Sequence, residues 1–178
     1  MKRIGMSTLG LALVISLVPV TTYAQTTTER SVATQRCTMA KQKIATHTAA
    51  IAAAQADHAT KYATIQQRVD ALVSSAAKAN YTGIDKLTTA RDSVAKAITS
   101  YTTQASVYTT ALATAQSAAC GEGTGEFMSA LATARTELKT LRASGAAVKT
   151  AVKQNAVPAL RDYATWLKTT TSSTQEQQ

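Results

Sequence analysis

Residues 120–127 read CGEGTGEF, and this stretch sets three glycines within five positions beside one of only two cysteines. The chain has seven glycines in all, so the rest of the sequence holds four. Glycine adopts the backbone conformations that end helices and close tight reversals. We therefore interpret the stretch as a corner between two helices, with Gly121 as a C-cap, Gly123 in the turn and Thr124 as the next N-cap.

On both sides of this corner, apolar residues recur at alternating steps of three and four, which is the repeat of a coiled-coil seam. Alanine and threonine dominate, and proline is scarce, so helix is favoured almost throughout. We predict an all-α fold, an elongated antiparallel three-helix bundle held by one disulfide, with helices over residues 28–79, 83–119 and 125–168. Residues 169–178, TTTSSTQEQQ, contain no apolar side chain and are expected to be disordered.

Local signals predict how the helices end and bend. The short segment at residues 80–83 indicates a tight reversal, and Thr82 followed by Asp85 fits a capping box that opens the second helix. In the third helix the apolar stripe changes phase near Pro158, which removes a backbone donor and bends a helix. Tyr163 and Leu167 are expected to close that end of the bundle, and the alternative is that they form an exposed anchor with Trp166.

Cys37 and Cys120 are expected to form a disulfide, since the chain shows signs of export to an oxidising compartment. Closing a loop of about 84 residues would contribute roughly 4 to 5 kcal/mol. The bridge also bears on register. Pairing across the tightest turn sets Tyr62 opposite Tyr101 but separates the cysteines by about 9 Å, so we expect a register shifted by one heptad.

Residues 1–24 have the charged, apolar and small-residue order of a signal peptide, and the alternative is an uncleaved membrane anchor. The protein is thus expected to be exported to the periplasm, cell surface or medium. Without Lys2 and Arg3, 17 basic residues remain against 10 acidic ones, a net charge of +7 for residues 25–178. This favours anionic partners, although solubility alone explains such a charge.

The main candidate site is a row of cations on the third helix, spaced so that they share one side of it. They are Arg135, Lys139, Arg142, Lys149 and Lys153. One interpretation is a surface for an anionic envelope polymer, a lipid surface or an acidic protein. The other is a solvated flank whose charges pair loosely with Asp57, Asp70 or Asp92. No aromatic residue interrupts the row, which argues against specific nucleic-acid recognition.

Other motifs carry little chemistry. His47 and His58 share a helix face but lie about 16 Å apart, so they do not form one metal site, and His58 is expected to set register in the seam. CGEGTGEF lacks the context of a phosphate-binding loop. We expect no metal, no cofactor and no enzymatic activity, although a serine or threonine hydrolase would be detectable with a reactive probe.

The N-terminal signal, Arg36-Cys37 at the start of a long helix, and the CGEGTGEF corner before a basic helix together resemble a loose group of uncharacterised secreted two-cysteine helical-bundle proteins predicted from uncultivated bacteria. The resemblance covers about residues 30–165. It implies the bundle and the bridge by analogy and brings no activity, cofactor or binding residue.

The sequence therefore predicts an exported, non-catalytic bundle with a structural or binding role in the cell envelope, directed at an anionic partner through the third helix. The alternative is a holdase-type chaperone for unfolded exported proteins, which would need an accessible apolar groove. Self-association is left open by the alanine-rich seams.

Overall fold

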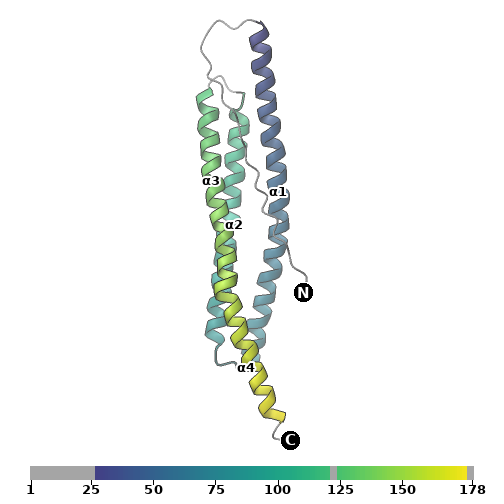
Figure 1. The fold of residues 1–178 in the computed structure, drawn as a ribbon, viewed down its shortest axis with the longest axis vertical. Helices are drawn as coiled ribbons and strands as arrows, with labels where there is room; N and C mark the ends of the chain where they lie inside the picture. Colours follow the sequence, from purple (N-terminus) through teal and green to yellow (C-terminus); the bar gives the residue numbers. More distant parts are fainter. Residues whose placement is uncertain (1–26, 121–123, 176–178) are drawn as a thin grey trace.

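The computed structural model of the chain describes residues 27–120 and 124–175 as three long helical rods that lie side by side (Figure 1). The first two rods are single α-helices, and the third is a continuous helix with a π-helical segment inside it. The elements are α1 (Thr27–Lys78), α2 (Ile84–Ala118), α3 (Thr124–Thr150), η1 (Ala151–Ala156) and α4 (Val157–Gln175). The predicted elongated antiparallel three-helix bundle is confirmed. Within the described residues, no helix is at once long and apolar enough to cross a bilayer.

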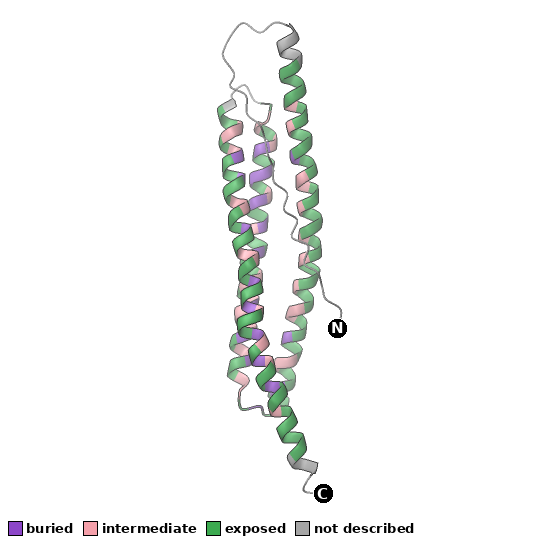
Figure 2. Cartoon of the chain, in the orientation of Figure 1, coloured by how far each residue is buried: buried purple, intermediate pink, exposed green. Residues whose placement is uncertain are grey.

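Burial is uneven among the three rods (Figure 2). Nine of the 35 residues of α2 are buried. Among the described side chains of α1, a helix of 52 residues, only Ile44, Val69 and Ala76 are buried. α2 is the central element, because it packs against α1 and also against α3, η1 and α4, whereas the backbones of α1 and α3 make few direct contacts. The first rod is thus the most loosely held.

Polar side chains fill much of the interface between α1 and α2. Nε2 of His47 is hydrogen-bonded to the hydroxyl of Tyr108 at 2.7 Å, and Nδ1 of His58 to the hydroxyl of Tyr101 at 2.6 Å. Gln55 donates to the backbone oxygen of Ala105 at 3.3 Å. These bonds compensate polar groups that would otherwise lose water on burial. His58 has the structural role in the seam that its position predicted.

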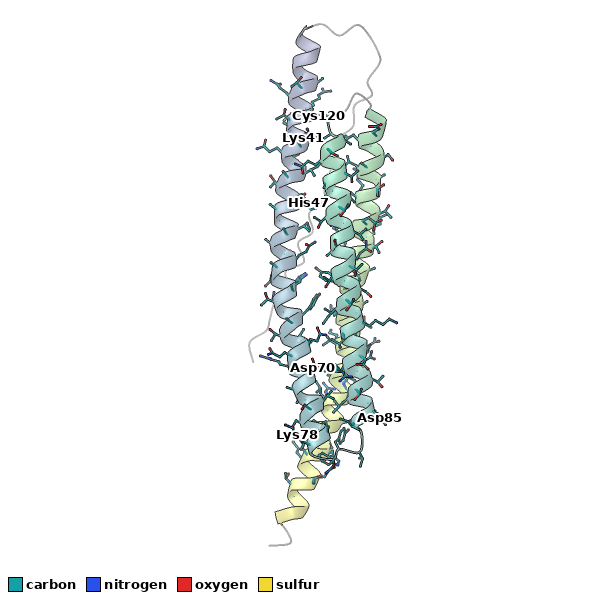
Figure 3. The ribbon with its side chains drawn as sticks, turned by 180° about the vertical axis from the view of Figure 1, so that it is seen from behind. Lys41, His47, Asp70, Lys78, Asp85 and Cys120 are labelled. Carbon is teal, nitrogen blue, oxygen red and sulfur yellow. A yellow bond between two sulfur atoms is a disulfide. The ribbon has the colours of Figure 1, made fainter. Side chains whose placement is uncertain are left out.

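The predicted disulfide is present, and it ties α1 to the end of α2, with the Cα atoms of Cys37 and Cys120 5.3 Å apart (Figure 3). The expected choice of register is partly wrong, because Tyr62 also contacts Tyr101, with ring centroids 5.2 Å apart. Side chains lean toward the N-terminus of their own helix. In this antiparallel pair the two rings lean toward each other, so they meet despite the offset that the disulfide imposes.

The reversal between α1 and α2 is as short as predicted, but its capping is different. Asn80 has a positive φ of 54°, and the N–H of Tyr81 donates to the oxygen of Ala76, which is a Schellman-type helix end. The predicted capping box at Thr82 is wrong. Gly83 is the N-cap of α2 and no side chain caps it. The side chain of Tyr81 is buried in the core, and α2 begins only after Thr82 and Gly83, at Ile84.

The predicted phase shift in the third rod occurs as the π-helix η1, immediately before Pro158. Ala151 and Ala156 are both buried although they are five positions apart, a step that an α-helix does not place on one face. The N–H of Val157 donates to the oxygen of Val152, and Asn155 donates to Ser93 of α2 at 2.7 Å. The change of phase is therefore a local widening of the helix beside the proline.

The far end of the third rod departs from two expectations. α4 continues to Gln175, so residues 169–175 are helical and not disordered. Nothing in this segment breaks a helix, since no glycine or proline follows Pro158. Leu167 does not close the bundle, because 37% of it is exposed. Trp166 takes that position beside Tyr163, with its ring centroid 5.2 Å from that of Tyr81.

Candidate anion-binding surface

The five cations predicted as a binding surface, which we call the basic row, all lie on exposed positions of the third rod. Four belong to α3, and Lys153 belongs to η1. A continuous helix carries them, so their order along the rod follows their order in the chain. The structure therefore presents the row as one elongated positive surface.

None of the basic row is neutralised by the acidic residues considered as its partners. Asp57 pairs with Lys61 on the same helix, and Asp92 pairs with the neighbouring Arg91 at 2.9 Å. The remaining ion pair among the described residues joins Lys86 to Asp162 at 3.5 Å. The interpretation of the row as a flank paired with Asp57, Asp70 or Asp92 is therefore wrong in its partners. The five cations have no carboxylate within 4.0 Å in the described parts of the chain.

The side of α3 on which the row lies follows from its neighbours. Gln104 of α2 donates a hydrogen bond to Glu137. Arg135 and Lys139 are each two positions from Glu137, which is about 200° of helix rotation. They therefore point away from this contact with α2, which leaves Glu137 outside the positive surface.

Arg142 is close to the polar interface of α1 and α2. Burial and the charge of Arg142 together lower the pKa of His47. Burial raises the pKa of Tyr108, and Arg142 opposes this effect. Arg142 is thus within electrostatic range of His47 on α1, a neighbour that the sequence did not indicate. The spacing of the histidines was visible in the sequence, but the partner helix that each would meet was not.

The tyrosines of this interface remain neutral hydrogen-bonding groups. Burial raises the pKa of Tyr62 and of Tyr101, so neither ionises near neutral pH. The hydroxyls of Tyr101 and Tyr108, which are hydrogen-bonded to histidines, can donate or accept according to the tautomer of the ring. These hydrogen bonds stabilise the helix interface.

Among the described residues, the other candidate sites give no support for a metal centre, and one groove lies between two helices. Within residues 27–120 and 124–175, no three His, Cys, Asp or Glu side chains gather as a metal site would require. An open groove of about 360 Å³ runs between α2 and α3 and is lined by Val107, Thr110, Thr133, Glu137 and three small side chains. The predicted roles of Gly121 and Gly123, and the predicted signal peptide, fall outside the described residues. α3 begins at Thr124, one residue before the predicted start.

Comparison of the chain with known protein families, with curated proteins and with solved structures finds no match. The function is therefore inferred from the geometry and charge of the bundle itself.

Proposed function

We propose that this protein is an exported, non-catalytic helical bundle of the cell envelope that binds an anionic partner through the basic row. The observation that supports the proposal most directly is that all five cations are exposed and have no carboxylate partner among the described residues. A cluster of like charges on one surface raises the local concentration of anions and speeds their association. The disulfide and the signal-like N-terminus support export.

The chaperone alternative has weaker support. A holdase needs a continuous apolar surface. The exposed large apolar side chains of the described residues are Val32, Met39, Val107 and Leu167, and they are spread over three helices. The groove between α2 and α3 is lined mainly by threonine and other small residues.

The test compares capture of partners from the envelope fraction by the mature protein and by a variant with all five residues of the basic row changed to Gln. A matched control removes five other exposed charges, by changing Lys41, Lys78, Lys86, Lys96 and Lys168 to Gln. We expect crosslinking pull-down to recover an anionic partner with wild type and control, and to lose it with the row variant at unchanged helicity. Equal capture by all three proteins, or by none, would contradict the proposal.

A further inference from the structure

The interface between α1 and α3 differs from the other two in the bundle. Both helices run antiparallel to α2 and therefore parallel to each other (Figure 1). α2 packs closely against each of them, but α1 and α3 have few direct backbone contacts. Because α1 and α3 run in the same direction, residues along the facing edges of the two helices keep the same order along the bundle axis. With few contacts between the helices, these residues remain exposed.

The edge of α1 that faces the basic row is itself basic. His47 marks this edge, because Ser75, four heptads further along α1, has its hydroxyl 3.4 Å from that of Tyr163 in α4, and the charge of Arg142 of α3 helps to lower the pKa of His47. Every seventh residue from His47 holds the same position in the heptad, and this series continues to Lys61 and Arg68. Lys43 is one turn before His47, and Arg36 is one heptad before Lys43. All four cations are exposed.

The two edges repeat in the same way. Arg135, Arg142 and Lys149 are also seven residues apart, so α3 carries its own heptad row of cations. In helical bundles, flanking positions of this kind commonly carry opposite charges that pair across the interface. Between Arg36 and Arg68 the α1 flank carries one acidic residue, Asp57, two heptads after Lys43. The other charges of this flank and those of the α3 flank are positive, and like charges along one interface repel. Lys61 is neutralised by Asp57, but Arg36, Lys43 and Arg68 have no ion pair among the described residues.

We propose that α1 and α3 together form one binding surface for a linear acidic polysaccharide, which lies along the bundle axis between the two basic edges. This inference rests on the proposed function and extends it, because it assigns half of the surface to α1. An anionic chain in this position would replace repulsion between the edges with attraction to both.

The spacing and surroundings of the charges favour a polysaccharide. Cations one heptad apart are roughly 10 Å apart along the helix. One heptad spans about two sugar units, so every second carboxylate of a chain such as polygalacturonate could meet a cation, whereas double-stranded DNA carries one charge about every 1.7 Å. Of the exposed large apolar residues, Val32 and Met39 are one turn before Arg36 and Lys43, and none belongs to α3. Two such side chains at one end of the α1 edge do not make the continuous apolar face of a helix that lies on a bilayer. The tyrosines next to the interface pack against His47, His58 or one another and are not free to stack on bases.

The test measures binding of the mature, disulfide-bonded protein to polygalacturonate, over a range of salt concentrations. The α1 variant changes Arg36, Lys43 and Arg68 to Gln and leaves the basic row intact. The control changes Lys41, Lys86 and Lys96 to Gln, which removes the same charge from other surfaces. We expect the α1 variant to bind about tenfold more weakly, with a shallower dependence on salt, and the control to bind like wild type. Circular dichroism verifies that all proteins are equally helical.

The outcomes separate the two proposals. If the row variant loses binding and the α1 variant does not, the surface on α1 is wrong and the proposed function stands. If neither variant loses binding, both proposals are wrong. Tighter binding to polyphosphate, single-stranded DNA or acidic phospholipid vesicles than to polygalacturonate would overturn the assignment to a polysaccharide.

Discussion

At the scale of single residues, the histidine–tyrosine pairs decide how α1 attaches to α2. Helix α1 has too few large apolar residues to form a seam from them alone, since its described buried side chains are one isoleucine, one valine and one alanine. His58 occupies a seam position that leucine or isoleucine would fill in a regular coiled coil, and His47 flanks the seam three positions after Ile44. They favour one alignment, because each donor must find its acceptor.

Removing one hydroxyl from this interface tests that role. Tyr101→Phe leaves His58 without its partner, and we expect the free energy of unfolding to fall by about 1 kcal/mol. Tyr62→Phe is the matched control, because Tyr62 packs in the same cluster but has no hydrogen bond from its hydroxyl in the described structure. Urea unfolding measures both. A loss as large in Tyr62→Phe as in Tyr101→Phe would show that ring packing, and not the hydrogen bond, dominates.

The environment of His47 predicts a pH dependence of stability. Burial and Arg142 lower its pKa below 6.5 in the folded chain. As the pH falls from the unfolded pKa of His47 toward its lower folded pKa, the unfolded chain binds more protons than the folded chain. The free energy of unfolding therefore decreases. The stabilising effect is complete above the unfolded pKa and is lost toward acidic pH.

The measurement is chemical unfolding of wild type and of His47→Gln between about pH 7.5 and about pH 5.5. We expect wild type to lose more stability over this range than the variant. Arg142→Gln removes one of the two causes and is expected to reduce the loss without abolishing it. Equal slopes in all three proteins would show that His47 is not a source of the pH dependence.

At the scale of secondary structure, the π-helix η1 adjusts the third rod to its partners. Val148, Ala151, Ala156, Ala159 and Tyr163 are buried in succession, and the single step of five lies within η1. An α-helix of the same sequence would rotate α4 by about 100° relative to α3 and move its buried face away from the core. The extra residue thus lets one helix follow the bundle on both sides of Pro158.

Deleting a residue tests this account. Loss of the exposed Gln154 turns the step of five into a step of four, so we expect a regular α-helix with the same core and a stability within about 1 kcal/mol of wild type. Loss of the exposed Thr140 instead shifts every later residue of the rod, and we expect a loss of several kcal/mol. Thermal unfolding followed by circular dichroism compares the two. Similar damage from both deletions would contradict this role for η1.

At the scale of the whole molecule, one covalent bond compensates for the loosely packed first rod. The cysteines are 83 residues apart in the chain, and the bond joins α1 to α2 at the end farthest from their turn. The turn holds the C-terminal end of α1, and the disulfide holds it at Cys37, ten residues after the helix begins. Its polar interface then needs to supply less of the free energy of docking.

Cys37→Ser is therefore expected to lower the free energy of unfolding by about 4 to 5 kcal/mol, on the chain-entropy estimate for a loop of this length. It should also make Cys120 reactive toward an alkylating agent in the exported protein. Differential scanning calorimetry and mass spectrometry measure the two effects. Alkylation of the wild-type cysteines without a reductant would show that the bond does not form in the exported protein.

Much of the fold follows from the sequence, because periodicity and chain reversals are local properties. The heptad pattern predicted three helices with ends near those observed, and the turn at residues 80–83 and the phase change before Pro158 were in the expected places. The details that were predicted wrongly depend on contacts between side chains of different elements. Gly83, and not Thr82, is the N-cap of α2, because Tyr81 enters the core. Trp166, and not Leu167, packs at the end of the bundle, because its ring lies against those of Tyr81 and Tyr163.

The sequence by itself determined the all-helical architecture, the disulfide partners and the presence of a basic row on the third helix, since each depends on residue type and spacing along one chain. Only the tertiary structure decided that Tyr62 meets Tyr101 although the cysteines are bonded, that the row has no acidic partner among the described residues, and that Arg142 is within electrostatic range of His47. These are relations between helices. They depend on the rotation and offset of each rod against its neighbours, which a pattern within one helix does not specify.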